Sequence, residues 1–222
     1  MTADLIVCRD ATGAHWGLGS ASPDRPLVLI GWRVRPEPVD AGMPAAVADI
    51  LSRAMCATGW AGFPASTRSD LGGLAPPGDD DTRIASVPGS GGRWRRLLGD
   101  GTDFARQVST RRPDHARTLF DDPGHPWWLG AQAASLSDPD RPPPTLDAAT
   151  WRALLGPGWR SVVPALSVLG PVLGVLRAGV DGDVLGLCGA APAFEDAFLG
   201  RVRGEAHAAG ASYREVAHAE FA

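Results

Sequence analysis

Hydrophobic runs near the N-terminus predict two β-strands followed by an amphipathic helix. Residues 4–9 and 27–35 are rich in Val, Ile and Leu, as strands are. From residue 44 to residue 58 the apolar positions instead recur at the spacing of one helical face. The predicted apolar face holds Val47, Ile50, Leu51, Ala54 and Thr58. The predicted polar face holds Asp49, Ser52, Arg53 and Cys56.

The middle of the chain has apolar residues at spacings that predict a largely helical segment. Phe104 and Val108 lie four positions apart, which places them on one face of a short helix. Proline at positions 113 and 126 suits the first turn of a helix, because its missing N–H has no partner there in any case. The predicted helices cover residues 102–112, 113–120, 126–136 and 145–155.

The C-terminal third predicts a β-hairpin, a helix and a returning strand. Two apolar runs, 172–177 and 184–188, flank an Asp-Gly-Asp turn. A helix opens at Pro192, and a strand is expected over 212–218. One face of the helix should be buried, because four apolar residues recur every four positions. They are Phe194, Phe198, Val202 and Ala206.

Together these patterns predict the α+β class: mixed small sheets with helices, a helical middle segment and the C-terminal hairpin–helix–strand unit. Residues 71–92 are rich in Gly, Pro and Asp, with a short strand-like island at 82–87. We therefore expect residues 1–222 to form a single α+β domain. The alternative is two lobes, 1–70 and 93–222, joined by the segment 71–92.

Composition removes several classes of enzyme. All 21 basic residues are Arg, and the chain has neither Lys nor Asn. Without Lys, a Schiff-base enzyme, a Walker-type phosphate loop and a protein kinase are excluded. Without Asn, the chain has no N-glycosylation acceptor and no Cys-His-Asn triad. The missing residues have A/T-rich codons, so the bias indicates a GC-rich genome.

The same composition predicts a cytoplasmic protein that does not span a membrane. The three cysteines are far apart and odd in number, which suits a reducing compartment better than a disulfide framework. Residues 1–10 lack the long apolar run of a signal peptide. The most apolar stretch, 162–176, contains two prolines and is shorter than the roughly 20 residues of a membrane helix.

An arginine cluster in residues 93–117 is the main candidate for ligand binding. Seven Arg and three Asp give this stretch a formal charge of +4, whereas the rest of the chain has a formal charge of −8. Guanidinium groups match phosphate and carboxylate geometry, and Trp faces can stack on a ligand. The alternative is that these Arg lie on solvated faces and pair with Asp. The candidate binding residues are Arg93, Trp94, Arg95, Arg96, Arg106, Arg111, Arg112, Trp127 and Trp128.

A second candidate is catalytic. Asp121, Asp122 and His125 fall within five residues, just before a predicted helix. Carboxylate and imidazole groups in this arrangement could serve as a general acid and base. A helix-capping loop explains the same residues without catalysis.

A third cluster, near the C-terminus, is expected to be structural. Its spacing matches neither a metalloprotease nor a di-iron site. Aspartates 79–81 are expected to be solvated rather than metal-binding. We therefore predict no metal site, and the sequence indicates no particular cofactor. The C-terminal cluster consists of Glu205, His207, Glu215, His218 and Glu220.

The function expected from these features is that of a non-catalytic binding or accessory protein. It would recognise an acidic partner or a phosphorylated ligand through the Arg/Trp cluster. The net charge of −4 makes a protein partner or an anionic ligand a better expectation than duplex nucleic acid. The alternative is a hydrolase or lyase that uses Asp121, Asp122 and His125. The oligomeric state stays open.

Overall fold

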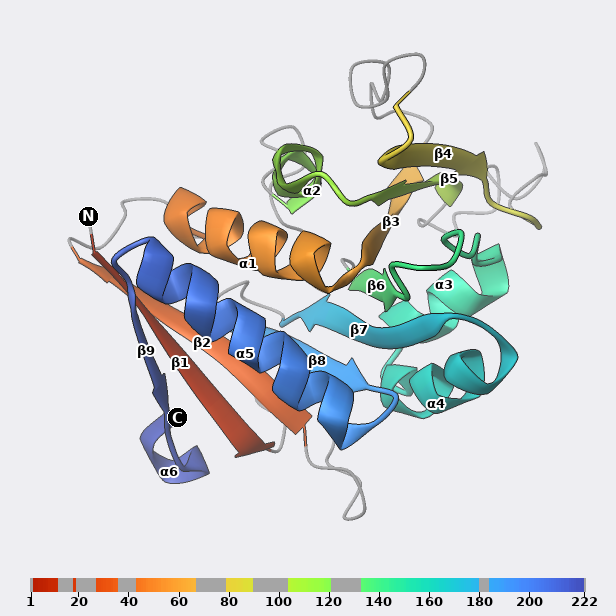
Figure 1. Cartoon of the computed structure of the whole chain (residues 1–222). Coiled ribbons are helices and arrows are strands. Elements are labelled where there is room, and N and C mark those ends of the chain that lie inside the picture. The colour runs from red at the N-terminus through yellow and green to blue at the C-terminus, as the bar shows by residue number, and fades with distance from the viewer. Residues whose placement is uncertain are drawn as a thin grey trace.

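The strands form one nine-stranded mixed sheet in the order β4-β5-β3-β6-β7-β8-β2-β1-β9 (Figure 1). The computed structural model describes residues 2–11, 18, 27–35, 43–66, 79–89, 104–120, 133–179 and 184–221. Neighbouring strands are antiparallel except β1 and β9, which are parallel. The strands are β1 Thr2–Ala11, β2 Leu27–Arg35, β3 Trp60–Ser66, β4 Thr82–Ser86, β5 Phe104–Thr110, β6 Ala133–Ser137, β7 Val172–Ala178, β8 Val184–Gly189 and β9 Ser212–Glu215.

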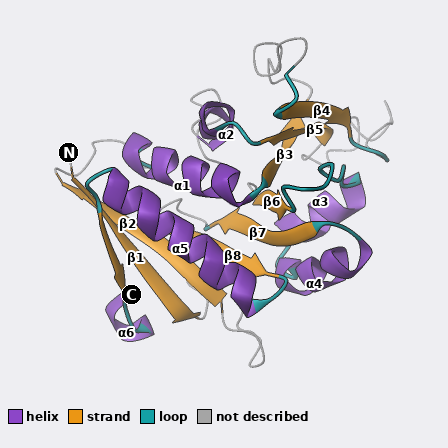
Figure 2. Cartoon of the chain, viewed as in Figure 1, coloured by secondary structure: helices purple, strands orange, loops and turns teal. Residues whose placement is uncertain are grey.

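Helices cover both faces of this sheet. Helices α1 and α5 lie side by side on one face, with α2 next to α1, while α3 and α4 pack on the opposite face (Figure 2). No helix in the described part of the chain is long and apolar enough to cross a bilayer. The helices are α1 Ala45–Thr58, α2 Pro113–Phe120, α3 Ala148–Leu155, α4 Trp159–Leu169, α5 Pro192–Ala208 and α6 His218–Phe221.

The two-residue period of the strands builds a separate core on each face. On β8, Leu185 and Leu187 belong to the core under α1 and α5, whereas Val184 and Cys188 belong to the core under α3 and α4. A strand that is buried on both faces is apolar along most of its length, and β8 is buried throughout. This explains why the apolar runs of the sequence are continuous rather than alternating.

The α+β class is confirmed, but the strands form one sheet instead of several small ones. The helix 45–58, the helix 113–120, the hairpin of β7 and β8 and the helix from Pro192 are all as predicted. The short island at 82–87 is strand β4. Strands from both sides of the segment 71–92 alternate in the sheet, because β3 lies between β5 and β6.

The prediction of a helical middle segment is wrong for two stretches. Residues 104–110 form β5, where Val108 faces one side of the sheet and Gln107 and Ser109 are buried on the other. Residues 133–137 form β6, which is buried at all five positions. The rest of the predicted third helix, 126–132, lies outside the described residues. In both stretches, sheet pairing on two sides overrides the local helical spacing.

Candidate functional site

The described residues line an open cleft of about 1080 Å³ between α1, α2 and α5. We call it the α1–α2 cleft. Its volume is comparable with that of small-molecule sites, which span roughly 300–1,000 Å³. The charged and thiol side chains that line it are Asp49, Arg53, Cys56, Arg111, Asp114, Arg117 and Glu205.

Helical spacing puts the α1 side chains into this cleft. Asp49, Arg53 and Cys56 lie four and three positions apart, so they share one face of α1. Asp49 and Arg53 agree with the predicted polar face, whereas Cys56 is half-buried and packs against the core, and Ser52 is buried. The Ser52 side chain is fully buried, because it lies between the polar face and the buried Ala48 and Met55 side of the helix.

Carboxylates hold the arginines around the cleft in place. Arg117 of α2 forms an ion pair with Asp49 of α1 at 3.1 Å, which links the two helices. Arg111 donates from Nε to Asp81 Oδ1 at 3.1 Å. Each of these pairs is partly exposed and therefore contributes about 0–1 kcal/mol. Their main effect is to fix where the guanidinium groups point.

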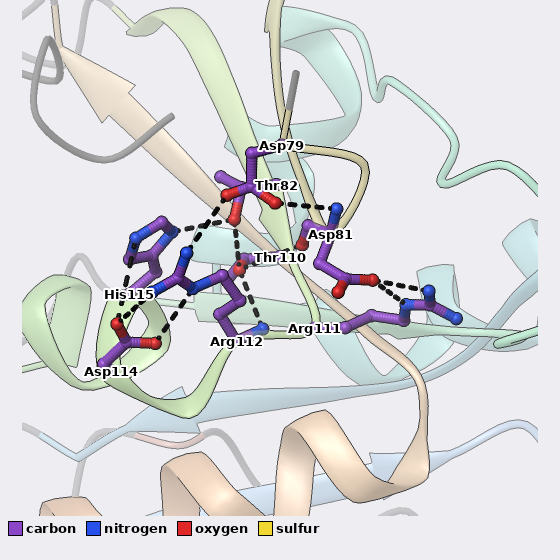
Figure 3. Close-up of polar contacts among 8 residues, drawn as sticks. All are labelled: Asp79, Asp81, Thr82, Thr110, Arg111, Arg112, Asp114 and His115. Carbon is purple, nitrogen blue, oxygen red and sulfur yellow. Dashed lines mark hydrogen bonds and ion pairs between the residues drawn. The ribbon is translucent and has the colours of Figure 1, made fainter. Parts of the chain in front are cut away.

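Arg112 is held by two aspartates. Its Nε and second terminal nitrogen donate to the two oxygens of Asp114 at 3.2 and 2.7 Å. Its other terminal nitrogen lies 3.6 Å from Asp79 Oδ2 (Figure 3). These contacts raise the pKa of Arg112, with the Asp114 hydrogen bond as the largest cause. The same hydrogen bond holds the pKa of Asp114 below its usual range.

Behind this pair lies a buried array of two hydroxyls and an imidazole (Figure 3). Thr82 Oγ1 is 2.8 Å from Thr110 Oγ1 and 2.7 Å from His115 Nδ1. Thr110 can donate its single hydroxyl proton to the carbonyl of Asp81 at 3.2 Å. While Thr110 donates to Asp81, Thr82 donates to Thr110 and His115 Nδ1–H donates to Thr82. The other tautomer of His115 reverses these directions, with Thr110 donating to Thr82 and Thr82 to Nδ1.

This array does not have the geometry of a catalytic triad. A nucleophilic hydroxyl needs an accepting imidazole and access to the substrate. Thr82 is only 3% exposed and His115 only 7% exposed. The other ring nitrogen of His115 lies 4.0 Å from Asp114, beyond hydrogen-bond distance. The array instead ties the start of α2 to β4 and β5.

The Cys56 thiol in the cleft is not activated. Burial raises its pKa to about 12, and the negative charge of Asp114 adds to this effect. A thiol with so high a pKa is protonated near neutral pH and is a weak nucleophile. The cleft therefore presents Cys56 as a small polarisable contact.

Three arginines near this side of the molecule have no ion pair with another described residue. They are Arg53 on α1, Arg83 on β4 and Arg106 on β5, and all three are exposed. The guanidinium groups of Arg83 and Arg111 lie over the ring of Trp60, at 5.3 and 4.9 Å from its centroid. Cation–π contacts of this kind contribute about 0.5–1 kcal/mol at exposed sites.

Only part of the predicted site falls in the described residues. Arg111 and Arg112 come together beside the cleft, where they are paired with aspartates, as the alternative interpretation of the cluster expected. Arg106 lies towards the other end of β5. The remaining predicted site residues lie outside the described part of the chain. They are Arg93, Trp94, Arg95, Arg96, Asp121, Asp122, His125, Trp127 and Trp128.

Sequence reasoning did not single out Arg53 and Asp49 as site residues. The signal was present in the polar face of α1, but the sequence does not show that α2 packs beside that face. Glu205, expected to be structural, lines the cleft from α5. Glu215 from the same C-terminal set accepts hydrogen bonds from Arg9 at 2.9 Å and Arg203 at 2.7 Å.

The chain has no detectable similarity to a protein-family model, to a curated protein or to a solved structure. Within the described residues, no three His, Cys, Asp or Glu side chains are grouped so that they could hold a metal ion. Function must therefore be argued from the geometry of the cleft and of its surroundings.

Proposed function

We propose that this chain is a non-catalytic binding or accessory protein of the cytoplasm that recognises an acidic partner or a phosphorylated ligand. The observation that carries the proposal is the α1–α2 cleft, which is lined by three arginines, of which Arg53 has no ion pair with another described residue. Guanidinium groups donate several hydrogen bonds in one plane and match the oxygens of phosphate and carboxylate groups.

Arg53 is the residue that should contact the anion first. It is exposed, lines the cleft and has no carboxylate partner among the described residues. Arg117 faces the same space but is already paired with Asp49 at 3.1 Å. A bound anion can accept hydrogen bonds from Arg53, and it can also accept one from Arg117 while Arg117 stays paired with Asp49. Glu205 on the opposite wall opposes the anion and limits its affinity.

The experiment is calorimetric titration of two probes, inorganic pyrophosphate and a tetraglutamate peptide, at low and high salt. Arg53→Gln should weaken binding about tenfold, because a charge-assisted hydrogen bond contributes about 1.5–3 kcal/mol. Glu205→Gln should strengthen binding, since it removes a like charge. High salt should weaken all of these interactions.

Arg201→Gln is the matched control. Arg201 is exposed on α5 and is not among the residues that line the cleft, so its loss changes the net charge by the same amount. Binding should stay as in the unmodified chain. Equal affinities of Arg53→Gln and Arg201→Gln would overturn the cleft as the binding site, because net charge alone would then account for any change.

A further inference from the structure

Strand β4 is an edge strand of the sheet in the described part of the chain. Its hydrogen-bonding pattern shows which main-chain groups point outward. Arg111 N donates to Asp81 O at 2.8 Å, and Val87 N donates to Ala105 O at 3.0 Å. In an antiparallel pair, bonded residues alternate along the strand. Arg83 and Ala85 therefore also bond to β5. The N–H and C=O groups of the alternate residues along β4 point away from β5.

The outward-facing residues of β4 are Thr82, Ile84 and Ser86. Within the described part of the chain, β4 pairs only with β5. Thr82 is 3% exposed, so that end of the edge is covered. Ile84 is half-buried, and Arg83 and Ser86 are exposed. Among the described residues, the part of this edge that no strand covers runs over residues 83–86.

The charges beside this edge are positive. The two outermost strands carry Arg83 and Arg106 and no carboxylate. Neither Arg has an ion pair with another described residue. The aspartates just before β4 are partly neutralised, since Asp81 pairs with Arg111 and Asp79 lies near Arg112. Asp80 remains exposed at the N-terminal end of the strand.

We infer that β4 accepts an acidic extended segment of another protein, which adds to the sheet as a further strand. Strand addition uses main-chain hydrogen bonds for affinity and side chains for specificity. Arg83 and Arg106 lie on opposite faces of the sheet, because Arg83 is paired with Ser109 and Arg106 with Ser86. Acidic side chains on the two faces of the added segment would therefore each lie on the same face as one of these arginines, away from Asp80. A second copy of β4 fits less well, because it would bring the same arginines together across the new pair. The inference rests on the proposed acidic partner but not on occupation of the α1–α2 cleft.

The decisive variant is Ser86→Pro. The N–H of Ser86 points away from β5, so proline removes no hydrogen bond of the existing sheet while it blocks the outer edge. The probe is a fluorescein-labelled peptide of about ten residues that repeats Glu-Val-Val, so that successive Glu side chains point to opposite faces of the added strand. Its binding is followed by fluorescence anisotropy. Ser86→Pro should weaken binding about tenfold or more, whereas Ser86→Ala should bind as the unmodified chain does.

Ala85→Pro tests the assignment of inward and outward groups. The Ala85 N–H faces β5, so this proline removes a hydrogen bond to the Gln107 main chain and should lower the melting temperature. Ser86→Pro should leave the melting temperature close to that of Ser86→Ala. A second measurement uses peptides N-methylated at alternate amides. Only the set whose amides face β4 should lose binding.

Arg83→Gln with Arg106→Gln tests the charge contribution. The double variant should weaken binding and flatten its salt dependence. If this variant weakens binding but Ser86→Pro and both N-methylated peptides bind normally, the acidic partner stands and strand addition is overturned. If the unmodified chain does not bind the Glu/Val peptide although pyrophosphate binds through Arg53, strand addition is overturned and the cleft proposal stands. If neither probe binds, both proposals are overturned.

Discussion

The Gln107 side chain is only 2% exposed. Its hydrogen bonds connect β5 to the segment that leads into α3. Its Nε2 donates to Ser109 Oγ at 3.0 Å and to Pro144 O at 2.7 Å. Its Oε1 accepts from Leu146 N at 2.9 Å and from Trp151 Nε1 at 3.1 Å. An amide side chain has two donor hydrogens and two acceptor lone pairs, so all of its capacity is used.

Gln107→Leu should therefore lower the free energy of unfolding by about 3 kcal/mol, because it leaves several buried groups without partners. Urea denaturation followed by Trp fluorescence measures the change. Arg106→Gln, on the same strand but exposed, should change stability by less than about 0.5 kcal/mol. A Gln107→Leu protein as stable as Arg106→Gln would contradict this network.

The reactivity of Cys56 should depend on Asp114. The pKa of the thiol is raised to about 12 by burial and by this carboxylate. Asp114→Asn removes the negative charge, which lowers the thiol pKa and should raise the alkylation rate at pH 8 a few-fold. Iodoacetamide labelling followed by mass spectrometry measures the rate. Cys8 and Cys188 are buried and should react only after unfolding. An unchanged or slower rate at Cys56 would contradict the role given to Asp114.

Glu215 should make stability depend on pH in the acid range. Its pKa is held below the usual value, about 4.3, chiefly by the hydrogen bond from Arg9. A lowered carboxyl pKa stabilises the fold above the unfolded pKa, and this stabilisation is lost as the pH falls through the folded value. Glu215→Gln should therefore be less stable than the unmodified chain at pH 7. The difference should shrink below about pH 4.3, as urea titrations at a series of pH values would show. A difference that stays constant down to pH 2 would exclude this linkage.

At the scale of residues, sequence reasoning succeeded where the relevant neighbour is local. The outward direction of Asp49 and Arg53 follows from helical spacing alone. The pairing of Arg111 with Asp81 and the contact of Arg112 with Asp79 did not follow, since these aspartates are about 30 residues away in the chain. The composition did show that Arg must do the surface work of the absent Lys. It did not show which arginines lack an acidic partner.

At the scale of elements, β5 and β6 show why a pattern can mislead. Phe104 and Val108 are four apart, a spacing that fits one helical turn and also two periods of a strand. The sequence 133–137 consists of Ala, Ser and Leu, which has no strand preference of its own. Only the neighbours β3 and β7 make it a buried strand. The helix α4, which contains Pro164, was not predicted either.

Pro164 also predicts how α4 can be stabilised. Without an N–H, it leaves the carbonyl of Arg160 without its usual helical donor, and the Cys188 thiol donates to that carbonyl at 3.8 Å. Pro164→Ala restores a helical N–H and should raise the free energy of unfolding by about 1 kcal/mol. Thermal unfolding measures the change. Pro142→Ala, at an exposed position outside any helix, should give no gain. A gain in both variants would show that the helix is not the cause.

At the scale of the whole molecule, the sheet order bears on whether the chain is one domain. Strand β3 belongs to the first 70 residues, yet both of its neighbours, β5 and β6, follow the segment 71–92. Strand β2 likewise pairs with β8. If the strands after residue 92 were removed, β2 would lose β8 and β3 would lose β5 and β6, and the core that they cover would be exposed. We therefore propose that residues 1–222 are a single cooperative unit.

A fragment of residues 1–70 should not fold alone, because β2 would lose β8 and β3 would lose both of its neighbours, β5 and β6. Its circular dichroism should change gradually on heating, and it should bind a hydrophobic dye. The full chain should instead melt in one transition that is coincident for circular dichroism and Trp fluorescence. A cooperative melt of the fragment would favour the two-lobe alternative.

The long separation between β2 and β8 also matters while the chain is being made. β2 ends at Arg35 and β8 begins at Val184, so about 150 residues must be added before this pairing can form. Translation at about 5–20 residues per second makes the delay about 7–30 s. Throughout that interval the hairpin of β1 and β2 exposes apolar residues that later lie in both cores. The nascent chain is therefore open to aggregation and to chaperone binding until the ribosome has passed β8.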